Sequence, residues 1–486
     1  MARLSVGMAT AATLALLSSG LGMGSALPTK VAAADASIWN RLIAQPGSLS
    51  LSDAYPTVGQ ADTLIASGLP AGSNVAVLWQ TVHGAWQVDG PTFIGAHYTY
   101  GVRVLTRAKT TPQGSLTLRF TIPSGYGGQH LLGVELPAGR LAAVTSATVI
   151  PSLKLAASRV PEGGFFEFTM RGVGYQPYFS QFPVTYDNRL TGNVTAVSTQ
   201  GTAHFAVRAE GVGPHQIVIY NGTEGAPYLN IQQSPFAFMP TFSFPVTVLA
   251  ATPRTVSDAL PRLNAATGGK LVASPASGVV GASYTLIGHG LAPVHRYTLT
   301  WWTTKGSHVS GRGYGTLLRT MGTVTTTTQG TFRRVAKVPP DLGGPAHRIT
   351  LTSDGKLVAT TQFRIFPKLV AVTPNPAPEG SLVTITLLGG GWTYYDNIYS
   401  VDYDNGFVGF GCAFNSQGDL QIQLRATGRP GVHFIDLYPS IWKGRQTLPN
   451  PYLLPQLTYN RDHPGDWIPS FHLLLRVTPA RPRRAG

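Results

Sequence analysis

Four histidines recur at one place in a repeated pattern, and histidine is the side chain most often used for both proton transfer and metal binding. They are His130, His215, His347 and His433, and each follows a Gln-Gly pair by 14 to 17 residues. Each histidine belongs to a separate copy of the pattern, so no two need to approach one another. We therefore expect a structural role, as hydrogen-bonding groups at the start of a strand, and no metal site.

The run Asp402-Tyr-Asp404-Asn405-Gly places oxygen side chains at the spacing that a calcium loop uses. The twelfth position of such a loop is Ala413, and the repeat that matches Asp402 has Thr185. A hairpin turn in which Asp and Asn adopt positive φ is the favoured interpretation. The chain also lacks Gly-x-Ser-x-Gly and His-Glu-x-x-His motifs. We expect a protein that is not an enzyme, with no catalytic residue, cofactor or metal.

Aromatic residues are the remaining candidates for binding. They are dense after Gly391, where outward-facing rings either stack on sugars or pair across strands, and cross-strand pairing is favoured. Two long apolar segments, 227–240 and 451–469, would be costly in water, so each packs on a neighbouring module or meets a partner. Packing on the preceding module is slightly favoured. The candidate ligand- or partner-binding residues are Trp392, Tyr394, Tyr395, Tyr452, Trp467, Tyr228, Phe236 and Phe238.

The residues between each Gln-Gly pair and its histidine alternate between apolar and polar and end in a turn, as in 115–122 and 419–424. This pattern predicts a strand, a turn and a strand. The composition agrees, since only 12% of residues are charged, against about 25% in a typical protein, and there are 56 Gly and 37 Pro. Short alternating strands closed by turns indicate an all-β protein of antiparallel sandwiches.

The repeat has a second level, because Tyr186-Asp187-Asn188 recurs 217 residues later as Tyr403-Asp404-Asn405. This predicts two pairs of domains in the order A-B-A-B. The expected boundaries are a signal peptide at 1–34, an N-terminal segment with a short helix at 35–48, domain A1 at 49–150, domain B1 at 151–249, a linker at 250–268, domain A2 at 269–367, domain B2 at 368–479 and a basic tail at 480–486.

One block of B2, residues 372–390, has a proline, glycine, strand and glycine-turn order, and residues 329–350 close A2 in a matching way. These blocks resemble bacterial immunoglobulin-like domains of the IPT/TIG type. The resemblance implies four tandem immunoglobulin-like antiparallel β-sandwiches, extracellular modules that act as spacers or adhesive elements. The long closing segments of B1 and B2 depart from the usual short modules.

Export without disulfides is expected, because a signal-like N-terminus precedes a chain whose single cysteine is Cys412. No later stretch is apolar for long enough to span a bilayer. The net charge of +15 favours acidic partners, while scattered arginines argue against nucleic acid.

The leading hypothesis is a secreted or cell-surface structural or adhesive protein that acts by spacing and by binding a cell-envelope polymer, a glycan or an extracellular protein. The alternative is a carbohydrate-binding array that uses the aromatic face and closing loop of B2. Four modules in an extended row would span about 100 to 150 Å. The oligomeric state stays open.

Overall fold

The computed structural model describes residues 37–221, 225–261, 263, 269–307, 313–413, 417–442, 451–465 and 467–480. The predicted signal peptide, 1–34, and the basic tail after Ala480 lie outside the described residues. Within them the chain forms strands and four short 3-10 turns, with no α-helix. The all-β prediction is confirmed. No helix in the described part is long and apolar enough to cross a membrane.

In A1, two antiparallel sheets pack face to face around Leu64, Trp79 and Leu132. The smaller sheet contains β1 (Ser48–Leu51), β2 (Ala61–Ser67) and β5 (Leu116–Thr121), and the larger contains, in order, β4 (Thr92–Lys109), β3 (Asn74–Asp89), β6 (Gly128–Glu135) and β7 (Leu141–Val149). Apolar residues at alternate positions of each strand supply this core.

The same arrangement recurs in the three later sandwiches. In B1, β8 (Ser152–Leu155), β10 (Phe165–Arg171) and β13 (Thr202–Arg208) face β12 (Arg189–Val194), β11 (Phe182–Tyr186), β14 (Gly213–Ile219), β15 (Phe242–Leu249) and β9 (Arg159–Pro161). In A2, β17 (Leu271–Ser274), β19 (Ser283–Gly288) and β22 (Phe332–Lys337) face β18 (Ser277–Val279), β24 (Lys356–Phe366), β23 (His347–Ser353), β20 (Arg296–Gly306) and β21 (Tyr314–Thr325). In B2, β25 (Lys368–Thr373), β27 (Leu382–Leu388) and β30 (Leu420–Arg425) face β32 (Phe471–Thr478), β31 (Gly431–Ser440), β28 (Ile398–Tyr403) and β29 (Gly406–Cys412), with β26 (Ala377–Pro378) beside β32.

This strand order is that of an immunoglobulin-like sandwich, as in A1, where β1, β2 and β5 form one sheet and β3, β4, β6 and β7 form the other. The immunoglobulin-like fold therefore follows from the topology itself. All four sandwiches share the order, so it does not distinguish A from B, and the A-B-A-B duplication stays a prediction. The turns were interpreted correctly, since Asp404 and Asn405 have φ of 51° and 56°.

The N-terminal segment forms one 3-10 turn, η1 (Ser37–Asn40), where the sequence predicted a short helix. Trp39 lies on the outer face of the larger A1 sheet, against Ala76, Leu78 and Leu141. It is only 8% exposed, so the segment covers that face of A1.

We expect Trp39→Ala to lower the free energy of unfolding of A1 by about 3 kcal/mol, because a large buried ring is lost from an apolar contact. Chemical denaturation of the chain measures this change. The neighbouring Asn40 is exposed, and Asn40→Ala serves as the control, with an expected change within about 0.5 kcal/mol. Equal effects of the two substitutions would contradict the assigned role of Trp39.

The predicted linker, 250–268, is only partly a linker. Its residues Val256 and Ser257 form β16 (Val256–Ser257), which pairs with β32 of B2. The Asp258 carboxylate then accepts a hydrogen bond from the Ser470 backbone N–H at 2.9 Å. The chain leaving B1 is thereby attached to B2 before it enters A2.

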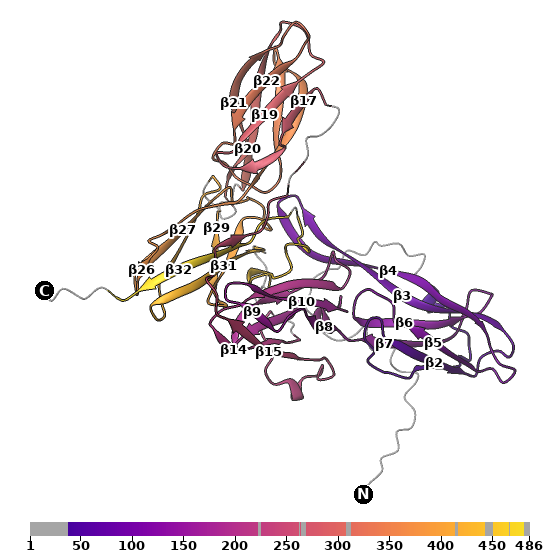
Figure 1. Cartoon of the computed structure of the whole chain (residues 1–486). Coiled ribbons are helices and arrows are strands. Elements are labelled where there is room, and N and C mark those ends of the chain that lie inside the picture. Colours follow the sequence, from indigo (N-terminus) through magenta and orange to yellow (C-terminus); the bar gives the residue numbers. More distant parts are fainter. Residues whose placement is uncertain are drawn as a thin grey trace.

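Figure 1 shows that A2 projects from the rest of the molecule, while the long β3–β4 hairpin of A1 reaches across toward B2. B1 and B2 lie side by side, with β12 next to β29. The Thr191 hydroxyl of B1 donates to the Asn405 carbonyl of B2 at 2.8 Å. The expectation of an extended row of four modules is therefore wrong, because contacts between distant sandwiches fold the row back on itself.

Candidate functional site: the junction of A1, B1 and B2

The closing segment of B2, residues 451–469, runs between B1 and the A1 hairpin. Its backbone joins B1 where the Asn193 N–H donates to the Pro455 carbonyl at 2.8 Å and the Leu457 N–H donates to the Asn193 carbonyl at 3.0 Å. The packing interpretation of this segment expected a contact with the preceding module, A2. That contact is present, because the Arg364 guanidinium of A2 donates to the Trp467 carbonyl at 2.8 Å. The segment also contacts B1 and A1, which are far away in the sequence.

Aromatic rings from A1 and B2 form one cluster at the tip of the hairpin. Phe93 is 2% exposed and lies 5.2 Å from the ring of Tyr452, and Trp86 lies 6.4 Å from Tyr459. The backbone N–H of Tyr394 donates to the Pro91 carbonyl at 2.8 Å. Burial of these rings attaches A1 to B2 across the surface of B1.

Asp462 connects all three sandwiches. The Trp86 indole N–H of A1 donates to its carboxylate at 3.0 Å, and the backbone N–H groups of Val197 and Ser198 in B1 donate at 2.8 and 2.6 Å. Burial raises the pKa of Asp462, although the hydrogen bonds from Ser198 and Val197 oppose the shift. The carboxylate acts as a hydrogen-bond acceptor shared by A1 and B1.

The rings predicted as an open stacking face are placed in domain contacts instead. Tyr395 is 8% exposed and its hydroxyl donates to the Gly90 carbonyl at 3.0 Å, while Tyr394 and Tyr452 belong to the aromatic cluster above. Trp392 lies 5.4 Å from Tyr314 at the base of A2, and Trp467 lies 6.1 Å from Phe366 there. A sugar could stack on Tyr395 only if the domains separated, so the carbohydrate alternative for B2 is not favoured.

The closing segment of B1 lies nearer its expected position. Phe238 stacks on Tyr55 of A1 with ring centroids 4.8 Å apart, so this segment does contact the preceding module. Phe236 stacks on Tyr178 within B1 at 4.5 Å. Tyr228, at 47% exposed, stays at the surface.

A buried charged cluster lies where B1 meets B2. The Arg208 guanidinium of B1 is fully buried and pairs with Asp436 of B2 at 3.1 Å, and His472 contacts the same carboxylate oxygen at 2.8 Å. Asp402 lies directly opposite Asp436 in the sheet. Because Arg208 is 0% and Asp436 1% exposed, a substrate cannot reach them while the sandwiches are docked.

Sequence reasoning missed this cluster, although one signal existed. Asp402 was noticed as a carboxylate that the matching repeat replaces with Thr185. An acidic residue that is unique to one copy indicates a contact that only this copy makes. The partner, Arg208, had no such signal, because it comes from a different sandwich.

Glu210 of B1 also belongs to this cluster, since its carboxylate accepts a hydrogen bond from the Asn405 side-chain amide of B2 at 3.0 Å. Glu210 and Asp402 have shifted pKa values. Burial, followed by the negative charge of Asp404, raises the pKa of Glu210 to about 8 against the pull of Arg189. Burial and then the charge of Asp436 raise the pKa of Asp402 well above its usual range.

The folded protein therefore holds these protons more tightly than the unfolded chain. Between the ordinary pKa of Glu210, 4.5, and its folded value of about 8, stability is expected to fall as the pH rises. Thermal denaturation at a pH of about 5 and of about 9 measures the change. In Glu210→Gln, which cannot titrate, this pH dependence should shrink; an unchanged pH profile would contradict the assignment.

The four repeated histidines occupy two environments. In A1 and A2 the ring stacks on a tryptophan, His130 on Trp79 at 4.9 Å and His347 on Trp301 at 4.5 Å. In B1 and B2 the ring nitrogen meets an aspartate at 2.6 Å, in the pairs His215–Asp187 and His433–Asp404. Each side chain bonds locally within its own sandwich, and no group of metal-ligating side chains occurs among the described residues.

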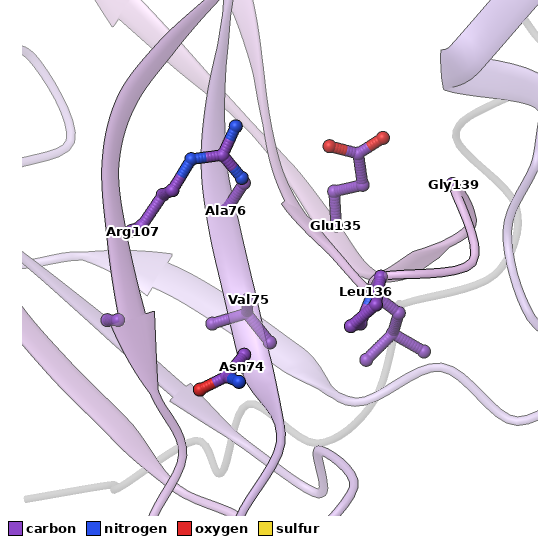
Figure 2. Close-up of a pocket in the computed structure, with 9 residues that line it drawn as sticks. Asn74, Val75, Ala76, Arg107, Glu135, Leu136 and Gly139 are labelled. Carbon is purple, nitrogen blue, oxygen red and sulfur yellow. The ribbon is translucent and has the colours of Figure 1, made fainter.

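A cavity of about 600 Å³ lies on A1, between the ends of β3, β4 and β6. Figure 2 shows Arg107 and Glu135 projecting from different strands at its rim, with Ala76 and Leu136 beside them. One acid and one arginine at an open rim do not provide the paired acid and base that hydrolysis requires. The cavity adds no catalytic candidate.

No family model and no curated protein matches the sequence. Solved structures that share some likeness include a Salmonella alpha-2-macroglobulin variant, with 10% identity, a TM-score of 0.20, and coverage of 87% of this chain but 30% of that one. The four-domain ectodomain fragment of ICAM-5 has 14% identity, a TM-score of 0.19, and coverage of 89% and 100%. Invasin, a bacterial integrin-binding protein, has 11% identity, a TM-score of 0.18, and coverage of 89% and 78%.

These scores are too low to carry an argument about function. The immunoglobulin-like fold rests on the strand order described above, and membership of the IPT/TIG type stays a prediction.

Proposed function

We propose that this chain is an exported, non-enzymatic structural or adhesive protein of the cell surface or the extracellular space. A1, B1 and B2 form a rigid base in which the shared junction suppresses motion between modules, and A2 is the module presented to a partner. The observation that carries the proposal is Asp462, a buried carboxylate that accepts hydrogen bonds from both A1 and B1. Shared buried contacts of this kind make a mechanical unit out of separate sandwiches.

Binding to cell envelopes tests this function. Mature protein, starting near residue 35, is mixed with envelope fragments of the producing cell or with extracellular matrix and then sedimented. We expect the protein in the pellet, and its release by high salt, because the net charge of +15 favours acidic polymers. Protein that stays in the supernatant with every preparation would contradict the proposal.

Export has its own test. N-terminal sequencing of protein recovered from culture medium or from the envelope is expected to begin near residue 35, after the signal-like segment. Recovery of the full-length chain from the cell interior would oppose it.

A further inference from the structure

The larger sheet of A2 differs from those of the other sandwiches on its outer face. The central strand is buried on both faces in A1 (75–79 of β3), in B1 (β11) and in B2 (398–402 of β28). In A2 the corresponding strand, β20, alternates between buried and partly exposed residues. Trp39 covers this face in A1, and Arg208 of B1 packs on it in B2. The face of A2 therefore remains accessible.

Two neighbouring rows of side chains cross this face. Thr320, Thr300, Thr350 and Thr360 are register partners across β21, β20, β23 and β24. In the adjacent row Trp302 pairs with Arg348. Leu318, which is 53% exposed, and Gln362 continue this second row. Thr350 is 2% exposed, so the accessible hydroxyls beside the ring and the guanidinium are those of Thr300, Thr320 and Thr360.

Trp302 positions Arg348. The guanidinium lies over the indole ring at 5.2 Å, its Nε donates to Thr360 at 3.3 Å, and the indole N–H donates to Thr350 at 3.0 Å. When the flat face of a guanidinium lies on an aromatic ring, its N–H groups, which lie in the plane of the group, can still donate to a carboxylate. Among the residues that the structure describes, no carboxylate forms an ion pair with Arg348.

Most of the net positive charge of the chain is in this module. Residues 269–367 contain eleven Lys and Arg against two Asp, a net of +9 out of +15, whereas B1 (151–249) has five of each sign and is neutral. This imbalance attracts a polyanion to A2 in particular.

We propose that this face of A2 binds an acidic polysaccharide, with Arg348 pairing to a sugar carboxylate and the accessible hydroxyls of Thr300, Thr320 and Thr360 exchanging hydrogen bonds with sugar hydroxyls. The proposal rests on the proposed function and names the partner and the binding face. A protein partner would require several apolar anchors at the centre of the contact. This face has one ring and one exposed leucine among hydroxyl and amide groups, which suits a ligand that is itself rich in hydroxyl groups.

Titration calorimetry of the full mature chain with alginate, a polyuronate, tests the proposal at about physiological ionic strength. We expect Arg348→Gln to weaken binding about tenfold, as for one lost charge-assisted contact. Arg333, exposed on the smaller sheet of the same module, provides the matched control. Arg333→Gln removes the same charge and should change affinity less than about twofold.

Three results would overturn the inference: no binding of alginate, an equal loss in Arg333→Gln, or equally tight binding of poly-glutamate, which has carboxylates but no sugar. Thr300→Val keeps the side-chain shape and removes one hydroxyl, so a weakened affinity for alginate supports the role of the threonine row.

Alginate binding without envelope association would contradict the proposed function and leave this inference intact. If the protein associates with envelopes and Arg348→Gln does not weaken that association, the proposed function stands and this inference is contradicted.

Discussion

Arg208→Met is expected to destabilise the docking of B1 on B2 by about 3 to 5 kcal/mol. The substitution leaves Asp436 buried at 1% exposure without its cation, next to Asp402, whose pKa is already raised by burial and by the charge of Asp436. The Asp436 carboxylate would keep only His472 as a neighbouring partner, and a buried carboxylate that has lost its guanidinium is costly. Chemical denaturation and small-angle scattering of the full chain measure the loss of stability and of compactness.

Arg189 supplies the control for this prediction. It also pairs with an acid of the cluster, Glu210 at 3.4 Å, but its side chain is 41% exposed. Arg189→Met should therefore change stability by less than about 1 kcal/mol. The double substitution Arg208→Met with Asp436→Leu should recover part of the loss, because no buried charge is left from the pair. Equal effects of the two arginine substitutions would show that burial does not decide the outcome.

Phe93→Ala is expected to cost about 3 to 5 kcal/mol of docking free energy between A1 and B2, the usual range for a fully buried phenylalanine. The ring is 2% exposed and lies against Tyr452 at the tip of the hairpin, far from the core of its own sandwich. Faster amide hydrogen exchange in residues 451–465 measures release of the closing segment, while exchange in the core strands of A1 should not change.

Ile94 is the matched residue for this test, because it follows Phe93 on the same strand and is 45% exposed. Ile94→Ala should leave exchange in 451–465 unchanged. If Phe93→Ala instead accelerates exchange throughout A1, the ring belongs to the core of A1 and the junction assignment is wrong.

Much of the fold could be predicted because strand formation depends on neighbouring residues. Alternation in 115–122 and 419–424 corresponds to β5 and β30, and the Asp404-Asn405 turn was predicted with its positive φ. The short helix predicted at the N-terminus is present only as the 3-10 turn of residues 37–40, since four residues are too few to propagate an α-helix. Burial of Trp39 on the A1 sheet fixes this turn in place. The strand β16 inside the predicted linker was not foreseen, because it forms only by pairing with β32, more than 200 residues later.

The aromatic candidates show where local reasoning ends. The sequence assigned Tyr395 and Tyr452 to a ligand, to a partner or to packing on the preceding module. The surface that covers them comes from the A1 hairpin, some 300 residues earlier. The apolar surface of an aromatic ring favours burial. The residues around it in the sequence do not indicate which distant segment will cover it.

The sequence alone therefore determined the all-β fold and most of its strands and turns, since these follow from alternation and from glycine, proline and Asx chemistry within a few residues. Tertiary structure alone decided that A1, B1 and B2 share one buried junction and that A2 keeps an open, basic face. The physical reason is that burial and ion pairing depend on which surfaces meet. Arg208 and Asp436, 228 residues apart, acquire their roles only when the two sandwiches exclude water between them.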